Sequence, residues 1–236
     1  MIPKIIHQCM LPNLGEVCRP LSAEELRLGS HMRRVMPDWE YRLWNQTEVD
    51  ALVQEHFPQY HPIFGRIRRA VVRADICRYM YLFVHGGFYF DLDYKLIRPI
   101  NEQILSHSCV LPISRGAGSS FTLGNAVMGS ERFHPFWTEF IKGIFSTNDL
   151  ANLPEQMVEE VTGPKGITNF YLANVNKYED IYLPERSMFH PPHRFGGFSS
   201  QKSPETFGVH LSWGSWRTKN PLAKMKRILH RKLTSF

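Results

Sequence analysis

The chain has 236 residues, of which 43% are hydrophobic and 13% aromatic, and this composition excludes an intrinsically disordered protein. Its length suits one large α/β domain or two small ones. The net charge of +6, from 28 basic and 22 acidic residues, favours anionic partners such as nucleotide diphosphates, phospholipids or nucleic acid. The four cysteines form no CxxC pair and no regular framework, so the sequence predicts a reducing compartment and no structural zinc.

The start of the chain, MIPKIIHQ, places a proline and a lysine where the apolar core of a signal peptide would begin. The longest apolar run, residues 79–84, is far too short to cross a bilayer. The sequence therefore predicts a cytoplasmic location. Any membrane contact is expected to be peripheral, on the inner face of a membrane.

The first half of the chain alternates between strand and helix patterns, which favours a doubly wound, largely parallel sheet. In such sheets, ligands bind outside the carboxyl ends of the strands. The second half continues with shorter elements and a flexible segment over residues 115–120. Strands are expected over residues 4–7, 39–44, 88–93, 94–97, 109–113, 124–128, 181–183 and 207–211, and helices over 22–35 and 47–56 (with Ser22 and Thr47 as N-caps), 70–84, 134–145, 155–161 and 167–175.

The most informative segment covers residues 73–93 and reads RADICRYMYLFVHGGFYFDLD. After Gly86 and Gly87 the residues alternate, so Asp91 and Asp93 are expected on one face at the end of an apolar strand. Two carboxylates about 4 Å apart repel by about 4 kcal/mol at an effective dielectric constant of about 20. A hard divalent cation such as Mn²⁺ or Mg²⁺ would relieve that repulsion. The alternative is a solvated pair of aspartates that opens a turn, because a DxD motif alone is weak evidence.

The helix expected over residues 70–84 is apolar almost all round, yet it carries Asp75 and Arg78 side by side on one face. Burying an unpaired charge costs several kcal/mol, so the two residues must pair or face a polar cleft. An internal ion pair that locks the helix to the sheet is one interpretation. The nearby carboxylates favour the other, in which all four charged residues line one cleft. Gly86 or Gly87 is expected to end this helix in a left-handed conformation.

The end of the chain is basic: residues 217–236 hold seven Lys or Arg and no acid. Asn220 and Pro221 suit an N-cap and a first turn, and the apolar residues that follow line one face of a helix. One interpretation of this basic amphipathic helix is that it docks on an anionic membrane. The other is that it packs on the domain with a solvated basic face.

The segment over residues 73–93 resembles the sugar-binding segment of DxD-containing glycosyltransferases of the GT-A fold. This family includes initiation-specific α-1,6-mannosyltransferases, inositol-phosphoceramide mannosyltransferases and bacterial capsular-polysaccharide glycosyltransferases. Residues 2–8, 125–130, 162–164 and 209–216 are similar to further family motifs, in the same order, although Met10 stands where a tryptophan is common. The resemblance implies an α/β fold of GT-A type, with a Rossmann-like mixed, mostly parallel sheet flanked by helices. It implies a catalytic domain over residues 1–216, followed by the helix of residues 217–236.

The resemblance also implies roles for particular side chains. Asp93 would bind Mn²⁺ (or Mg²⁺) directly, and Asp91 would contact the ribose, or the metal through water. Asp75 would accept hydrogen bonds from the donor sugar, with Arg78 beside it, so that these four residues form the catalytic set. His210 is implied as a further metal ligand, its alternative being a histidine that is merely hydrogen-bonded. The other implied donor-binding positions are His7, Gln8, Gly86, Gly87, Ser215 and Trp216, of which His7 and Gln8 could instead satisfy loop backbone and Trp216 could be a core aromatic.

The resemblance implies a metal-dependent, retaining glycosyltransferase that moves a hexose from a UDP- or GDP-linked sugar to a glycan or lipid-linked acceptor. The alternative is a catalytically silent carbohydrate or nucleotide-sugar-binding module of the same fold. The intact set of charged residues at positions 75, 78, 91, 93 and 210 favours the enzyme. Nucleic acid is not expected as a partner, because the basic cluster lies in a terminal amphipathic helix without interleaved exposed aromatics.

Overall fold

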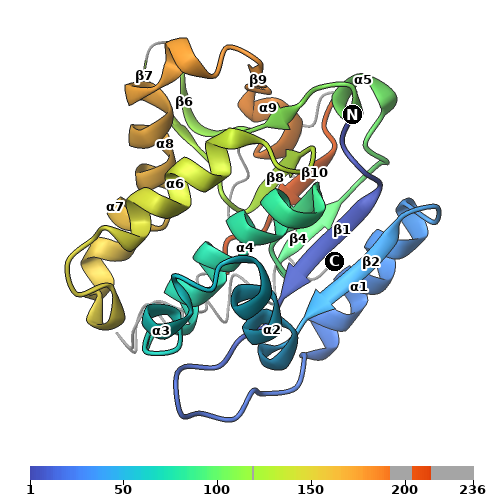
Figure 1. The fold of residues 1–236 in the computed structure, drawn as a ribbon. Coiled ribbons are helices and arrows are strands. Elements are labelled where there is room, and N and C mark those ends of the chain that lie inside the picture. The colour runs from blue at the N-terminus through green and yellow to red at the C-terminus, as the bar shows by residue number, and fades with distance from the viewer. Residues whose placement is uncertain (119, 192–203, 214–236) are drawn as a thin grey trace.

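The computed structural model describes residues 1–118, 120–191 and 204–213. Its centre is a six-stranded sheet with the strand order β2-β1-β3-β8-β5-β9 (Figure 1). Core residues lie on both faces of that sheet. Within the described ranges, no helix combines the length and the hydropathy that a bilayer crossing requires. The strands of the sheet are β1 (Ile5–Cys9), β2 (Glu40–Trp44), β3 (Gly87–Phe90), β5 (Cys109–Val110), β8 (Val127–Ser130) and β9 (Ile181–Tyr182).

The sheet is mixed and mostly parallel, as the resemblance implied. Strand β1 pairs in parallel with both β2 and β3, and β5 pairs in parallel with β9. Strand β8 lies between β3 and β5 and runs antiparallel to both. The amino end of β8 therefore lies at the edge of the sheet where β1 and β3 finish.

Alternate residues of β3 enter different parts of the core. Tyr89 belongs to the cluster that includes Trp137 and Phe140 from helix α6, which packs on α4 (Figure 1). Phe88 and Phe90 belong to a second cluster on the other side of the sheet. The helices are α1 (Ala23–Val35), α2 (Gln46–His56), α3 (His61–Phe64), α4 (Ala70–His85), α5 (Glu102–Leu105), α6 (Pro135–Phe145), α7 (Val158–Val161), α8 (Pro164–Ala173) and α9 (Arg186–Phe189), with 3-10 turns at Leu150–Asn152, Glu155–Met157 and Val175–Lys177.

Two of the expected helix starts can be compared with the observed caps. Ser22 caps α1, and its capping box with Glu25 is complete, as predicted. The prediction that Thr47 caps α2 is wrong, because Asn45 takes that position and forms a capping box with Glu48. Asparagine is a stronger N-cap than threonine, and the glutamate three residues later completes the motif.

Two small β-ribbons complete the fold. Strand β4 (Tyr94–Leu96) pairs antiparallel with β10 (Gly208–His210). Strands β6 (Ile113–Ala117) and β7 (Ser120–Leu123) form a hairpin in the stretch that was expected to be flexible, so that expectation is wrong for the strand residues. The strand expected over residues 124–128 begins only at Val127.

The end of α4 sets the start of β3. Gly86 caps the helix with φ 63°, and Gly87 follows with φ 91°, so both lie in the left-handed region that was predicted for one of them. A Cβ atom on Gly87 would lie 2.5 Å from the carbonyl oxygen of Ile5. Only glycine therefore allows the chain to reverse here and enter the sheet beside β1.

His7 of β1 is fully buried and uses both ring nitrogens inside the protein. The indole N–H of Trp44 donates to Nδ1 at 3.0 Å, and Nε2 lies 2.8 Å from the carbonyl oxygen of Gly86. Because an indole can only donate, Nδ1 is the acceptor and the proton of the neutral ring sits on Nε2. Burial is the largest effect on His7 and lowers its pKa to about 3.

We predict that protonation of His7 contributes to acid unfolding. The folded-state pKa of about 3 lies below the ordinary histidine value of 6.5, so the stability contribution of His7 is complete above pH 6.5 and falls as the pH drops. The expected loss is about 1.4 kcal/mol of unfolding free energy per pH unit below 6.5. Urea unfolding of the wild type and of His7→Gln between pH 7 and pH 4.5 should show a shallower acid slope for the variant. His56→Gln, at an exposed position of α2, should keep the wild-type slope, and equal slopes for all three proteins would contradict the prediction.

Candidate active site

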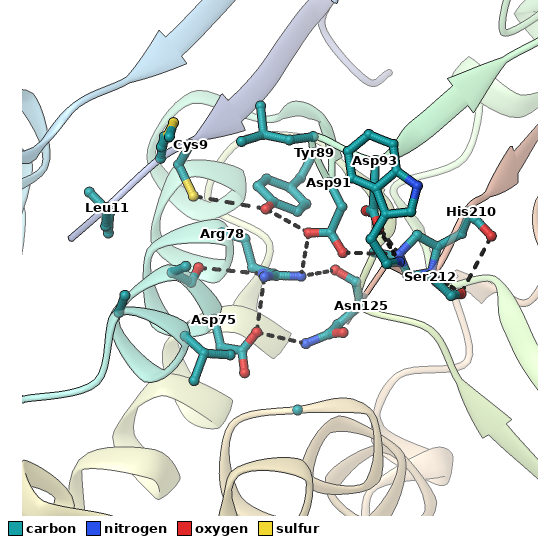
Figure 2. A pocket seen from close by; sticks show the side chains of 18 of the residues that line it. Cys9, Leu11, Asp75, Arg78, Tyr89, Asp91, Asp93, Asn125, His210 and Ser212 are labelled. Atoms are coloured by element: carbon teal, nitrogen blue, oxygen red, sulfur yellow. Dashed lines mark hydrogen bonds and ion pairs between the residues drawn. The ribbon is translucent and has the colours of Figure 1, made fainter. Parts of the chain in front are cut away.

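A cavity of about 770 Å³ opens at the edge of the sheet where β1 and β3 end and β8 begins (Figure 2). Asp91 follows β3 directly, and its backbone N–H donates to the carbonyl oxygen of Ala126 at 2.8 Å. The side-chain amide of Gln8 donates to the carbonyl oxygen of Asp91 at 3.1 Å. Three strands therefore fix the backbone around Asp91, and the cavity lies where an α/β sheet is expected to bind its ligand.

The guanidinium of Arg78 occupies the centre of the site (Figure 2). Its Nη2 lies 3.0 Å from Asp75 Oδ1 and its Nη1 lies 3.1 Å from Asp91 Oδ1. Nη1 also donates to the backbone carbonyl of Asn125 at 2.5 Å. Arg78 is only 6% exposed and still contributes to the cavity wall. Both interpretations of the helix charges therefore hold together, since Asp75 and Arg78 form a buried pair and also face the cleft.

The carboxylate of Asp75 is held by three donors. Besides Arg78, the Asn125 side-chain amide donates to Oδ1 at 3.1 Å, and the Thr162 hydroxyl donates to Oδ2 at 2.9 Å. Burial raises the pKa of Asp75 to about 7, against the opposing effect of Arg78. Asp75 is thus a fixed acceptor at the cavity wall whose charge changes near neutral pH.

The two motif aspartates lie in a turn and not in a strand. Strand β3 ends at Phe90, and the N–H of Tyr94 donates to the carbonyl oxygen of Asp91 at 3.0 Å, so the expectation of a strand continuing to residue 93 is wrong. Both carboxylates nevertheless reach one place. The turn lets β4 begin at once, and β4 pairs with β10, which brings His210 to the turn.

Asp91, Asp93 and His210 offer ligand atoms that all lie within 4.8 Å of one another. His210 Nε2 lies 3.1 Å from Asp93 Oδ1 and 3.6 Å from Asp91 Oδ2. The Ser212 hydroxyl lies 3.3 Å from His210 Nδ1, and the backbone N–H of Trp213 donates to Asp93 Oδ2 at 2.7 Å. These contacts of Ser212 and Trp213 orient the His210 imidazole and the Asp93 carboxylate toward the same point. Residues that hydrogen-bond to metal ligands commonly orient them in this way.

The charges of this cluster depend on one another. Burial opposes protonation of His210, but the carboxylates of Asp93 and Asp91 outweigh it and raise the pKa of the ring. Burial also opposes ionisation of Asp93, but His210 and the Trp213 amide outweigh it and lower the pKa of that carboxyl. Burial raises the pKa of Asp91 against the effect of Arg78. Asp93 and His210 thus stabilise the charged forms of each other.

The same three side chains fit a divalent ion. Two carboxylates and an imidazole form a ligand set that Mn²⁺ accepts, and carboxylates suit Mg²⁺ as well. The hydroxyl oxygen of Ser212 can accept a hydrogen bond from the Nδ1–H group of a neutral His210, which leaves Nε2 free to bind a metal. Asp93 keeps Oδ1 toward the cluster while Oδ2 is held by the protein backbone.

The other predicted donor-binding positions lie apart from the cavity wall or outside the described residues. His7 and Gln8 are buried, and their side chains bind Gly86 O and Asp91 O, which corresponds to the backbone-satisfying alternative. Gly86 and Gly87 form the turn between α4 and β3, and none of these four residues contributes to the cavity wall. The side chains of Ser215 and Trp216, and the helix expected over residues 217–236, lie outside the described residues.

Several site residues were not assigned a role from the sequence. Asn125 and Thr162 stand in segments that resembled family motifs, and here both hold Asp75. The hydroxyl of Tyr89 donates to Asp91 Oδ1 at 2.9 Å, and its ring lies 4.5 Å from the Arg78 guanidinium carbon. The alternation of β3 could have placed Tyr89 beside Asp91, whereas no local signal brings Asn125 and Thr162 to an aspartate 50 and 87 positions away.

The comparison with solved structures identifies the fold. A crystal structure of the ligand-free glycosyltransferase domain from the YGT toxin matches with a TM-score of 0.56, covering 77% of this chain and 80% of that domain at 9% sequence identity. At that identity the likeness concerns the fold alone. The fold, with the cleft at the strand ends, is that of a GT-A glycosyltransferase domain.

The sequence comparisons agree with this fold. Residues 23–111 match the model of the glycosyltransferase sugar-binding region containing the DXD motif, which confirms the resemblance of this segment. Mannosyl phosphorylinositol ceramide synthase CSH1 of Saccharomyces cerevisiae is 29% identical over 164 residues, covering 70% of this chain and 41% of that protein. Inositol phosphoceramide mannosyltransferase 2 of Schizosaccharomyces pombe is 30% identical over 169 residues, covering 71% and 46%. The chain spans less than half the length of these curated relatives.

We predict that Arg78 is required for stability because it separates two buried acids. Arg78→Met leaves Asp75 and Asp91 without their shared cation, which should cost about 3–5 kcal/mol of unfolding free energy. The cost should be smaller at pH 5 than at pH 8, because Asp75 binds a proton below a pKa of about 7 and its buried charge disappears. Urea unfolding at both pH values measures the difference. Arg34→Met, on the exposed face of α1, serves as the control, and an equal cost for the two variants would contradict this assignment.

Proposed function

We propose that this chain is a metal-dependent, retaining glycosyltransferase that moves a hexose from a nucleotide sugar to a glycan or lipid-linked acceptor. The observation that carries the proposal is that one cavity holds both a candidate metal-binding cluster and a fixed carboxylate that can bind a sugar. Asp91, Asp93 and His210 offer metal ligands, and Asp75 presents a fixed carboxylate beside them through Arg78. The DXD family match and the GT-A fold support the same reaction class.

We assign a different role in the reaction to each group of residues in the site. Asp93 and His210, with Asp91, would hold Mn²⁺ or Mg²⁺, which supplies neutralisation of the charge that a leaving diphosphate gains. Asp75 would accept a hydrogen bond from a hydroxyl of the donor sugar and hold the sugar in register. Asn125 and Thr162 fix the orientation of Asp75 before the donor binds. Such positioning supplies several kcal/mol of the barrier without covalent participation of the protein.

The contacts of Asp75 also bear on the stereochemical outcome. A double displacement with retention needs a carboxylate free to attack the anomeric carbon. Both oxygens of Asp75 already accept hydrogen bonds, and Arg78 further reduces the nucleophilicity of the carboxylate. We therefore favour a front-face reaction, in which the departing phosphate helps to deprotonate the acceptor. A β-linked product from an α-linked donor would contradict retention.

The names of the relatives guide the choice of substrates. The two curated relatives are named as a mannosyl phosphorylinositol ceramide synthase and an inositol phosphoceramide mannosyltransferase. We therefore propose a mannosyl donor as the first to test, and a lipid-linked acceptor alongside a glycan acceptor. The catalytically silent module remains the competing hypothesis. A measurement of nucleotide release separates it from the transferase, because a binding module binds a nucleotide sugar without cleaving the bond between sugar and diphosphate.

We predict that the purified protein releases nucleotide from one member of a panel of UDP- and GDP-sugars when Mn²⁺ is present. Asp93→Ala should lower the rate of release by at least about 100-fold and abolish its dependence on Mn²⁺, because the ligand that Trp213 and His210 orient is lost. Asp38→Ala, at an exposed position before β2, should keep the wild-type rate. Normal turnover by Asp93→Ala would overturn the site assignment. Binding of nucleotide without release from any donor would favour the silent module.

A second proposal concerns the basic C-terminal segment, whose sequence favours peripheral contact with an anionic membrane. We expect the full chain to float with vesicles that contain phosphatidylserine, and a chain ending at residue 216 to remain in the dense fractions. Raising the salt concentration should weaken flotation, because the contact would depend on the charges of the lysines and arginines in this segment. Equal flotation of the two proteins would remove the proposal for this segment.

A further inference from the structure

One wall of the cavity is formed by strand β6 and helix α9. Ser114 and Arg115 of β6 and Arg186 and His190 at α9 all line the same cavity as the Asp91, Asp93 and His210 cluster. The two elements pack against each other, so the wall is a continuous surface. Neither the metal-binding residues nor the residues around Asp75 explain why arginines stand here.

The backbone of β6 is irregular where two consecutive residues, Ser114 and Arg115, line the cavity. In a regular strand, neighbouring residues point to opposite faces. The register of the β6–β7 hairpin shifts between Ile113 and Arg115, which is a bulge-type irregularity, and the Ser114 hydroxyl donates to the carbonyl oxygen of Thr122 at 3.0 Å. Bulges redirect side chains next to functional sites. Here the irregularity allows both Ser114 and Arg115 to contribute to the cavity wall.

The wall continues to the metal ligands through two histidines. The ring of His190 meets the ring of His210 edge-on, with 6.1 Å between centroids. His190 is 8% exposed, and Nε of Arg186 donates to its backbone carbonyl at 3.2 Å. Burial lowers the pKa of His190 to about 3, and the positive fields of His210 and Arg186 act in the same direction. The wall is therefore electropositive through its arginines and is joined by one ring contact to His210.

The two arginines of the wall do not belong to the ion pairs of the described residues. Those pairs join Arg19 to Glu25, Arg69 to Glu155 and Arg78 to its two aspartates, among others. Among the described residues, neither Arg115 nor Arg186 has a guanidinium nitrogen within 4.0 Å of a carboxylate oxygen. Two guanidinium groups that share a cavity wall and carry no carboxylate partner in these pairs are suited to an anionic group with several oxygens, because each presents a planar fork of N–H donors.

We propose that Arg115 and Arg186 form an acceptor subsite that binds a phosphate group on the molecule to be glycosylated. The proposal rests on the proposed transferase function, in which the donor diphosphate lies at the metal cluster. The wall is a separate set of donors on β6 and α9, joined to that cluster through His190 and His210. A phosphate held there would leave the rest of the acceptor beside the donor sugar, so the arginines would act by recognition and take no part in bond making.

The test measures binding of a phosphate monoester when the donor site is already filled. The protein is saturated with Mn²⁺ and with the nucleoside diphosphate of its active donor, and sn-glycerol 1-phosphate is titrated by calorimetry against glycerol as the neutral counterpart. We expect the wild type to bind the phosphate ester and not glycerol. Arg115→Gln combined with Arg186→Gln should weaken that binding at least about tenfold. Arg34→Gln, a matched loss of one exposed arginine outside the cavity, should leave it unchanged.

A vesicle arm distinguishes a soluble phosphate from one held in a membrane. Co-sedimentation with phosphatidylcholine vesicles, with and without phosphatidic acid, is compared for the wild type and the double variant of a chain ending at residue 216. Binding by the wild type alone supports a lipid-held phosphate at this subsite, and binding of glycerol phosphate alone supports a soluble one. Equal binding of both probes by the wild type and the double variant would overturn the assignment.

Two further outcomes separate this inference from the proposed function. If the double variant loses affinity for the nucleoside diphosphate as much as for glycerol phosphate, the arginines serve the donor and the acceptor subsite is wrong. If nucleotide release by the wild type is normal but the phosphate ester does not bind, the subsite is wrong and the transferase stands. The circular dichroism spectrum of each variant is compared with that of the wild type, to verify that the substitutions in β6 and α9 leave the fold intact.

Discussion

Two carboxylates, one from helix α4 and one from the turn after β3, share one guanidinium, and the rest of the site depends on that arrangement. Arg78 lies 3.0 Å from Asp75 and 3.1 Å from Asp91, and it belongs to a helix most of whose residues are buried. Without the cation, the desolvation of two acids in one small volume would disfavour the fold. With it, the carboxylates of Asp75 and Asp91 keep a defined separation before any ligand arrives. The same contact thus serves stability and preorganisation.

The antiparallel strand β8 explains how the remaining polar groups reach this point. Because it runs against β3, its amino end lies beside the carboxyl end of β3, and Asn125 enters the cleft from just before that end. The side-chain amide of Asn125 holds Asp75 while its carbonyl holds Arg78. A fully parallel sheet would place the other end of the strand here. The mixed topology is therefore part of the site and not an irregularity of the fold.

The sequence predicted the parts of the site that lie close together along the chain. The helix with its charged pair, the glycine turn and the DXD carboxylates follow from periodicity and from the cost of buried charge, and all three are present. The strand end was misplaced because local alternation continues to residue 93 while the pairing of β3 with β8 ends at Phe90. Thr162 could not be linked to Asp75 from local pattern, because their contact joins separate helical segments across 87 positions. His210 was placed at the metal through the resemblance alone, since no spacing rule connects it to Asp93.

The pairing of β10 with β4 has a consequence for the order in which the molecule is built. All six strands of the central sheet are in place by residue 182, but the imidazole of His210 arrives only when a segment near the end of the described chain docks beside the DXD turn. Closing so long a loop is entropically slow compared with local contacts. During synthesis, the sheet can therefore form before Asp91, Asp93 and His210 are brought together. The candidate cation site is completed late, by the pairing of β10 with β4.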